Sequence, residues 1–395
     1  MNLVMSGLDY RRAPVALREG LSFTRTQGAE LCARLREESG LLGCVLLSTC
    51  NRTELYCSCP PQVQVDPAAL LCQAVGATDQ DLEGAFVTRR GEEAARHLME
   101  VAAGLQSQIW GDDQIVSQVK QAVADARERK TADPVLETLF REAAAAGKEV
   151  KSQVWLSRVP VSAASRAVEL LSQAAGGLAG RRALVIGNGE MGRLAAGLLY
   201  EAGCHVTITL RSYHHGETLV PAGCSVVPYE ERYRVMGEMD LLLSATVSPH
   251  YTVAEEELGE GAVPPLMVDL AMPRDIEPAV GERPGVRLFN MDDLGAAVDR
   301  AVPAQAQAIL ERHLERVDQW SRYRESLDAL EEVKRAITRR VLLTDDLSEL
   351  DQEELVELAV GRAVDLLSGG LRESVSQARL RRCAALIRTH TRAGG

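Results

Sequence analysis

The run from residue 180 to residue 212 constrains the fold more than any other part of the chain. It reads GRRALVIGNGEMGRLAAGLLYEAGCHVTITLRS: a buried strand, a glycine-rich turn, an amphipathic helix and a second strand. Strands joined through such a helix pair in parallel. Further apolar runs, MDLLLSAT and PLMVDLAM, follow at the spacing of a parallel sheet. We therefore predict a Rossmann-type, doubly wound α/β sheet.

The glycine-rich turn has the G-x-G-x-x-G spacing of a dinucleotide site. The first glycine permits the turn, the second lets the backbone approach a pyrophosphate, and the third allows close helix packing. An ordinary tight turn between strand and helix is the alternative interpretation. The predicted cofactor-binding residues of the turn are Gly187, Asn188, Gly189, Glu190, Met191 and Gly192.

The end of the second strand indicates which dinucleotide is bound. An NAD site carries an acidic residue there for the ribose 2′-hydroxyl, whereas this chain has Leu210, Arg211 and Ser212. A guanidinium beside a hydroxyl suits a 2′-phosphate. We predict that Arg211 and Ser212 select NADPH, unless Arg211 merely covers the sheet edge in solvent.

The length of 395 residues predicts two or three domains, and 46% apolar residues with 4% aromatics favour helices. We expect an α/β multidomain protein: an α+β catalytic domain over residues 1–158, the NADPH domain over 159–295 and an all-helical domain over 296–395. The proline of SRVPVS and a helix cap at Ser162 mark the first boundary.

The last domain begins with a long amphipathic pattern. A helix with such a stripe cannot bury it alone, so we infer dimerisation or docking on the other domains. The stripe comprises Leu310, Leu314, Val317, Trp320, Leu327, Leu330, Val333, Ile337 and Val341.

Charge and cysteine content exclude several classes of protein. A net charge of −12 disfavours a dedicated nucleic-acid binder, although 127–151 and the C-terminal RLRRCAALIRTHTR are locally basic. No segment is apolar enough for a membrane span or a secretory signal, so we expect a cytoplasmic protein without a membrane partner. Nine scattered cysteines indicate reduced thiols, and Cys57-Ser-Cys59 alone does not predict a metal site.

One cysteine has an unusual position. In LLSTCNRTELY, Cys50 directly follows an apolar strand and is flanked by polar residues. A thiolate can attack an activated acyl group to form a thioester, which a nicotinamide cofactor can reduce to an aldehyde. The alternative is a packed, structural cysteine.

The stretch LLSTCNRTELY resembles the nucleophile motif of the glutamyl-tRNA reductases. APVALRE, AAGLQSQIWGDDQI, AAGKEVK, PVSAASRAVEL, VIGNGEMGRLAA, VDLAMPRDIEP and LFNMDDL resemble further motifs of that family in order and approximate spacing. The resemblance implies a V-shaped homodimer whose helical domain, on a long helix, mediates dimerisation. It also implies NADPH-dependent reduction of glutamyl-tRNA to glutamate 1-semialdehyde, the first step toward 5-aminolevulinate and tetrapyrroles. An aminomutase that takes the aldehyde is the implied transient partner.

The resemblance also implies roles for individual residues. Cys50 is the nucleophile and His97 assists proton transfer; by residue type alone, a lone histidine on a helix is more often structural. Arg52 can bind the γ-carboxylate of the substrate bidentately. The implied substrate-binding residues are Thr49, Asn51, Arg52, Ser107, Asp112, Asp113, Gln114 and Gln118.

The chain departs from the family at several positions, and this leaves alternatives open. Asp112-Asp113 replaces Glu-Pro, Ser117 replaces Gly, Tyr10 replaces His, Gln153-Val154 replaces Glu-Thr, and Leu210 replaces Asn. One alternative is a paralogous thioester-forming reductase for another aminoacyl-tRNA or carrier-bound acyl group. Another is a non-catalytic, dinucleotide-sensing interaction protein in which Cys50 is inert.

Overall fold

The computed structural model describes residues 2–77, 84–112, 114–154, 162–211, 219–295, 301–342 and 351–370. The chain divides into two compact units, Met1–Asp318 and Gln319–Gly395. The first unit contains two separate β-sheets, one antiparallel and one parallel. Among the described helices, none has the length and apolar character needed to cross a membrane.

The N-terminal sheet has four antiparallel strands in the order β2-β3-β1-β4. Their bounds are β1 Leu3–Asp9, β2 Gly43–Thr49, β3 Arg52–Ser58 and β4 Val87–Arg90. Successive side chains of a strand point to opposite faces, and both faces of this sheet are covered by helices. The strand predicted in GCVLLST is confirmed as β2.

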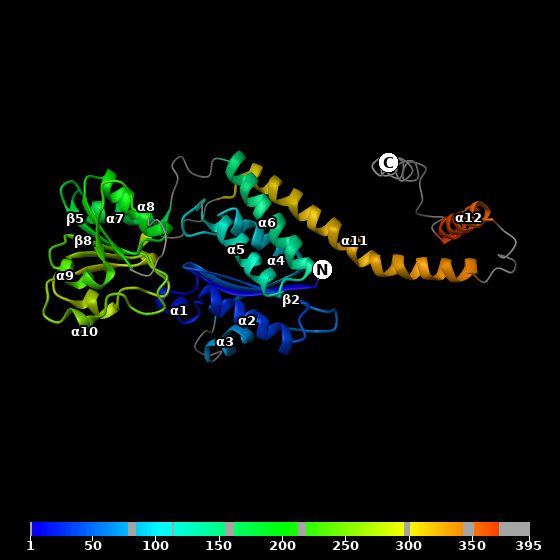
Figure 1. Cartoon of the computed structure of the whole chain (residues 1–395), viewed down its shortest axis with the longest axis horizontal. Coiled ribbons are helices and arrows are strands. Elements are labelled where there is room, and N and C mark those ends of the chain that lie inside the picture. The colour runs from blue at the N-terminus through cyan, green and yellow to red at the C-terminus, as the bar shows by residue number, and fades with distance from the viewer. Residues whose placement is uncertain are drawn as a thin grey trace. The chain divides into compact units, whose positions relative to one another are not determined.

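Two groups of helices cover this sheet (Figure 1). On one face lie α2, Arg25–Glu38, and α3, Pro67–Val75. On the other lie α4, Gly91–Ala102, α5, Ile115–Glu128, and α6, Pro134–Gln153. A short helix, α1, follows β1 over Val15–Gly20. The sequence prediction of an α+β domain ending in helices is confirmed.

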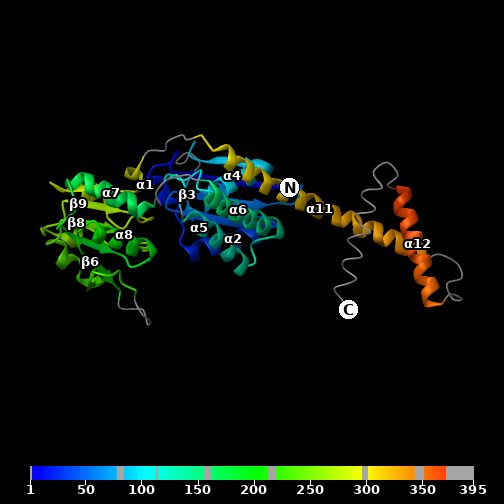
Figure 2. The same ribbon diagram turned by 90° about the horizontal axis from the view of Figure 1, so that it is seen from above.

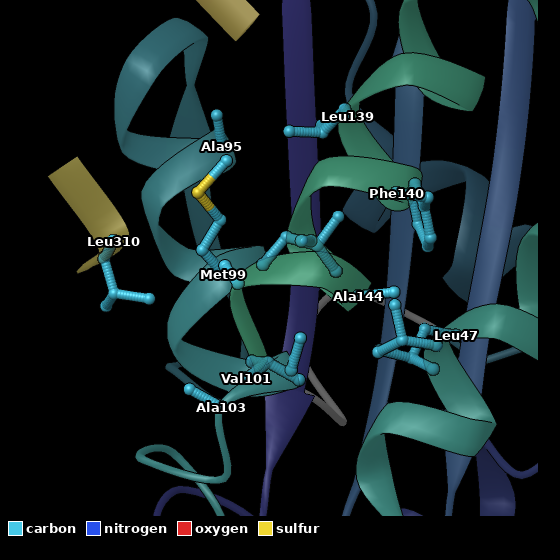
Figure 3. Packing of buried hydrophobic residues seen from close by; sticks show 14 of the residues in the cluster. Leu47, Ala95, Met99, Val101, Ala103, Leu139, Phe140, Ala144 and Leu310 are labelled. Carbon is cyan, nitrogen blue, oxygen red and sulfur yellow. The ribbon is translucent and has the colours of Figure 1, made fainter. Parts of the chain in front are cut away.

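The larger core of this domain lies between the sheet and α4 to α6. Figure 3 shows Met99 and Ala95 of α4, Phe140 of α6 and Leu47 of β2 pointing into it. The close approach of α4 and α6 requires Gly147, because a Cβ atom there would lie 2.3 Å from the carbonyl oxygen of Ala102.

The second sheet has six parallel strands in the order β10-β9-β8-β5-β6-β7, the doubly wound order of a Rossmann fold. This confirms the parallel sheet that we predicted from the first strand-helix-strand unit and from the apolar runs MDLLLSAT and PLMVDLAM. The strands are β5 Arg182–Ile186, β6 His205–Leu210, β7 Ser225–Pro228, β8 Leu241–Ser244, β9 Leu266–Asp269 and β10 Arg287–Phe289.

Helices cover both faces of the parallel sheet (Figure 1, Figure 2). The hydroxyl of Ser162 accepts a hydrogen bond from the Ser165 N–H and begins α7, as its sequence predicts. The α-helices are α7 Ala163–Ala175, α8 Glu190–Glu201, α9 Arg232–Met236 and α10 Glu255–Leu258. The 3₁₀ turns are η1 Tyr229–Glu231, η2 Pro278–Glu282 and η3 Met291–Leu294.

The predicted long helix is α11, Ala304–Leu342, and it is followed by α12, Gln352–Gly370. The first part of its apolar stripe, Leu310, Leu314 and Val317, is buried against the core of the N-terminal domain. His313 is 2% exposed, and its two ring nitrogens lie 2.9 and 3.1 Å from carboxylate oxygens of Glu142 and Glu149. The inference of docking is therefore confirmed for these turns of α11.

In the second unit, apolar side chains along α11 are exposed: Leu327 is 39%, Leu330 51% and Val333 39% accessible. The side chains of Ile337 and Val341 lie outside the described residues. The α/β multidomain fold class with a helical C-terminal part is confirmed. The boundaries near 158 and 295, and the dimerising role of the helices, stay predictions.

Candidate active site

Cys50 lies on the tight turn of a β-hairpin. Thr49 of β2 pairs with Arg52 of β3, so Cys50 and Asn51 form a two-residue turn. The hydroxyl oxygen of Thr49 accepts hydrogen bonds from the N–H groups of Asn51 and Arg52, both at 3.2 Å. The N–H of Tyr10 donates to the carbonyl of Asn51 at 2.9 Å. These bonds hold the backbone that carries the thiol.

The surroundings of the Cys50 thiol are mixed in charge. The side chain is half-buried and packs against the hydrophobic core of the parallel-sheet domain. Burial raises the pKa of the thiol to about 11. The Asp112 carboxylate also raises this pKa, whereas the Arg18 and Arg52 guanidiniums lower it. Without substrate, the thiol is therefore protonated at neutral pH.

A buried polar cluster lies on β3 directly after the turn. One carboxylate oxygen of Glu54 lies 2.7 Å from the Arg52 guanidinium and 2.8 Å from His97 Nε2. The other accepts a hydrogen bond from the Tyr56 hydroxyl at 2.7 Å. Burial opposes ionisation of Glu54, but His97, Arg52 and Tyr56 outweigh it and hold its pKa well below the ordinary value.

Glu54 joins the two predicted residues His97 and Arg52, and the sequence prediction missed it. The signal was present in STCNRTELY, because alternation along a strand places Arg52, Glu54 and Tyr56 on one face. Arg52 is only 1% exposed, and its Nη2 also donates to the carbonyl of Gln106. Its guanidinium is therefore held by partners within the protein.

The loop after α4 brings to the turn Asp112, which was predicted, and Gln106, which the sequence prediction missed. Gln106 in this loop receives the Arg52 hydrogen bond, and Asp112 at its end acts on the Cys50 thiol. Asp112 Oδ1 accepts from the Gln114 N–H at 3.0 Å, so the carboxylate also helps to begin α5. Lys151 of α6 donates to the carbonyl of Asp112.

Three predicted substrate-binding residues remain: Ser107, Gln118 and Asp113. Ser107 lies in the same loop and is 7% exposed. Gln118 of α5 instead lines a separate pocket of about 190 Å³ beside β2 and α2, together with Ser48 and Arg25. Asp113 lies outside the described residues.

A second missed group connects the Cys50 turn to the parallel-sheet domain. Arg18, 2% exposed, donates from Nε to the Cys50 carbonyl at 3.3 Å and from Nη1 to Asp292 at 2.8 Å. Nearby, the Arg274 guanidinium pairs with the Glu19 carboxylate at 2.5 Å. Arg18 lies 274 positions from Asp292, and Glu19 lies 255 positions from Arg274, so no local pattern could have indicated these pairs.

The predicted dinucleotide turn lines a pocket of about 360 Å³ at the carboxyl ends of β5, β6 and β8. Gly187 has a φ of 109°, and a Cβ atom there would lie 2.4 Å from the Ala245 carbonyl oxygen. A Cβ atom at Gly192 would lie 1.9 Å from the Gly187 carbonyl oxygen. Gly189 caps α8, whose first residues are Glu190 and Met191.

This pocket fits a pyrophosphate group, because the turn that leads into the N-terminus of α8, Gly187 to Gly189, lines it. The Asn188 side-chain oxygen is buried without a hydrogen-bond partner among the described residues. Arg211 also lines the pocket, and its guanidinium carbon lies 4.5 Å from the centroid of the Tyr229 ring. Ser212 lies outside the described residues.

The loops that border the pocket are held by two buried aspartates that the sequence prediction did not include. Asp275 accepts hydrogen bonds from the side chains of Ser244 and Thr246, at 2.7 and 2.5 Å. Asp269 accepts from three backbone N–H groups at 2.8 to 2.9 Å. No group of three or more His, Cys, Asp or Glu side chains in the described parts of the chain is placed to hold a metal ion.

Comparison with known proteins covers both sheet domains. The family model for the glutamyl-tRNA(Glu) reductase N-terminal domain matches residues 6–154, and the shikimate/quinate 5-dehydrogenase model matches residues 169–297. A solved structure of glutamyl-tRNA reductase from Methanopyrus kandleri is 28% identical, covers 99% of each chain and has a TM-score of 0.48.

Two curated relatives match along nearly their whole length. The glutamyl-tRNA reductase of Alkaliphilus oremlandii is 39% identical over 335 residues, 84% of this chain and 100% of its own. That of Acetivibrio thermocellus is 39% identical over 331 residues, 83% of this chain and 99% of its own. With this identity over more than four fifths of its length, the chain belongs to the glutamyl-tRNA reductase family.

Proposed function

We propose that this chain reduces the glutamyl ester of glutamyl-tRNA to glutamate 1-semialdehyde, the first step toward 5-aminolevulinate and tetrapyrroles. The observation that carries the proposal is Cys50 on a braced hairpin turn, with the Arg18 and Arg52 guanidiniums favouring its thiolate, in a chain of this family. The relatives named as glutamyl-tRNA reductases do not favour the alternative of another acyl substrate.

In the proposed first step, the Cys50 sulfur bonds to the ester carbonyl carbon. The carbon–oxygen bond to the tRNA ribose breaks, and the ribose oxygen leaves with a proton. Asp112 disfavours the thiolate in the free protein. A substrate ammonium paired with this carboxylate would cancel that effect, so substrate binding itself would favour attack.

The buried cluster has a positioning role in this scheme. Arg52 is held by Glu54 and the Gln106 carbonyl, so binding of a γ-carboxylate would require it to exchange one of these partners. We assign proton transfer to His97, with Glu54 orienting its ring. Thr49 supports the turn through its hydroxyl, and the unpartnered, buried Oδ1 of Asn51 can accept from the substrate.

The nucleotide-binding domain implies a nicotinamide cofactor, and we propose NADPH. When bound, the cofactor supplies the hydride that converts the thioester to the aldehyde. Arg211 at the pocket, with no acidic residue at the end of β6, supports a 2′-phosphate. Arg211→Asp should lower the KM ratio of NADH to NADPH at least tenfold. An unchanged ratio would remove Arg211 from the specificity assignment.

We further propose the division into domains 1–158, 159–295 and 296–395, with the last forming a homodimer through the exposed stripe of α11. Sedimentation of Leu330→Asp at micromolar concentration should give the monomer mass, and an unchanged mass would contradict this use of the stripe.

The aldehyde product supports a transient complex with an aminomutase. A diffusible aldehyde trap added to a coupled assay should then leave most of the flux uninterrupted.

The decisive experiment follows NADPH oxidation and trapped aldehyde with glutamyl-tRNA, glutaminyl-tRNA and free glutamate. We expect turnover with glutamyl-tRNA alone. Cys50→Ser should abolish turnover while leaving NADPH binding unchanged, and Cys224→Ser, at another half-buried cysteine, is the matched control. Aldehyde formation by Cys50→Ser would refute the covalent step.

A further inference from the structure

A pocket of about 410 Å³ adjoins the Cys50 turn, on the face of the N-terminal sheet that carries α4. Its walls come from β1 and the residues after it, from β3 and β4, and from α4 and the following loop. The lining residues are Met5, Gly7, Leu8, Asp9, Arg11, Arg12, Glu54, Val87, Arg89, His97 and Gln106.

The wall formed by β1 leads directly to the nucleophile. Asp9 pairs with Arg52 in the sheet, and the next residue, Tyr10, donates its N–H to the carbonyl of Asn51. Arg11 and Arg12 therefore leave the sheet at the end where Cys50 is presented. In an aminoacyl-RNA the ester carbonyl is bonded to the terminal ribose, so the RNA end must lie beside this turn during attack.

The charge of the pocket is divided between floor and rim. On the floor, Glu54 is already paired with Arg52 and bonded to His97. On the rim, Arg11 and Arg12 are exposed and Arg89 is half-buried. Among the described residues, no ion pair within 4.0 Å joins Arg12 or Arg89 to a carboxylate.

Tyr10, next to the rim residue Arg11 in the chain, also suits RNA. The Arg11 side chain donates to the Tyr10 hydroxyl at 3.1 Å, with its guanidinium carbon 5.8 Å from the ring centroid. An aromatic ring beside a guanidinium is a platform on which an unpaired base can stack. Arg12 and Arg89, which form no ion pair with another described residue, are therefore available to bind an anion in a chain of net charge −12.

We propose that this pocket binds the single-stranded 3′ end of the aminoacyl-RNA, with Arg12 and Arg89 contacting its phosphate groups and Tyr10 contacting a base. Guanidiniums bind phosphate oxygens bidentately, which would orient the ester carbonyl toward Cys50. The inference rests on the proposed function, because it takes glutamyl-tRNA as the substrate.

The first test compares two substrates that differ in phosphates. Arg12→Ala and Arg89→Ala should each raise the KM for glutamyl-tRNA about tenfold with kcat within about twofold. Turnover of 3′-O-glutamyl-adenosine, which has no phosphate, should stay unchanged. Arg34→Ala, on the exposed side of α2, is the matched control and should change neither value. Circular dichroism and NADPH binding check that the variants fold.

The second test measures binding of uncharged tRNA against salt concentration. Each substitution should reduce the slope of log affinity against log salt by about one, and Arg12→Lys should retain most of that slope. Equal losses with glutamyl-adenosine would overturn the proposal. So would a changed preference between glutamyl- and glutaminyl-tRNA, because the arginines would then contact the γ-carboxylate.

The two proposals fail in distinguishable ways. If wild-type protein binds tRNA through Arg12 and Arg89 but reduces no glutamyl ester, the proposed function is wrong and the pocket assignment stands. If reduction proceeds and both variants behave as wild type, the pocket assignment is wrong and the function stands.

Discussion

Substitution of Asp112 by Asn should make the Cys50 thiol more acidic. Asp112 is the charged group that most raises the pKa of this thiol. The change removes that charge but keeps a side-chain oxygen in the same place. The hydrogen bond that Oδ1 accepts from the Gln114 N–H at 3.0 Å is therefore retained. The variant thus separates the electrostatic role of Asp112 from its structural one.

The size of the effect follows from the shift of the thiol. The pKa of Cys50 is raised from the ordinary 9.0 to about 11. This lowers the thiolate fraction at neutral pH about a hundredfold, since each pKa unit is a factor of ten. Burial is the largest cause and remains in the variant. We expect removal of the carboxylate to lower the pKa by about one unit and to raise thiolate reactivity at pH 7.5 about tenfold.

The assay is the pH dependence of alkylation by iodoacetamide, with labelling of Cys50 followed by peptide mass spectrometry. The wild-type rate should still be rising at pH 10, and the Asp112→Asn profile should be displaced to lower pH. Asp125→Asn is the matched control, because its carboxylate pairs with Arg25 and is not among the charges named as acting on the Cys50 thiol. Rates within twofold of wild type at every pH would refute the electrostatic role of Asp112.

Three other substitutions test the buried ion pair and the packing of the fold. Glu54→Gln should cost about 2 to 4 kcal/mol of unfolding free energy in urea, because it leaves the buried Arg52 uncompensated. The folded-state pKa of Glu54 lies below the unfolded value, so the ionised carboxylate stabilises the fold fully above about pH 4.5. The difference in unfolding free energy between wild type and variant should therefore shrink as the pH falls further. A difference that stays constant with pH would contradict this. Gly147→Ala should destabilise by about 1 to 3 kcal/mol, because its Cβ would meet the backbone of α4. Gly197→Ala in α8, with nothing within 4 Å of the new Cβ, should instead stabilise by about 0.5 to 1 kcal/mol, and equal effects at the two sites would contradict the packing argument.

Signals carried by a few neighbouring residues were sufficient for much of the fold and the nucleotide site. The alternation of apolar runs with G-x-G-x-x-G specified the first strand-helix-strand unit, and the structure has the full six-stranded order. Ser162 was correctly predicted to cap α7, because capping depends on residues three positions apart. The position of Cys50 after β2 was likewise local information.

The acidity and partners of the site residues could not be predicted in the same way. Arg52 was predicted to bind substrate, but β3, α4 and the loop at Gln106 together bury it against Glu54. The motif LLSTCNRTELY predicted that Cys50 is a nucleophile, but it gave no indication that burial and Asp112 raise the pKa of the thiol. Both results depend on desolvation and on charges from separate segments, which have no signature in a short window of sequence.

By itself, the sequence determined where the strands, the helix cap at Ser162, the glycine-rich turn and Cys50 lie along the chain, because local structure depends on contacts between near neighbours. Tertiary structure alone decided that Arg18 connects the Cys50 turn to Asp292 and that the rim arginines gather beside that turn. It also decided which part of the α11 stripe is buried, since Leu310 packs on the N-terminal core while the side chain of Leu330 is 51% exposed. The physical reason is that burial and charge pairing depend on which distant segments meet, and the pattern of an amphipathic helix is the same whichever surface covers it.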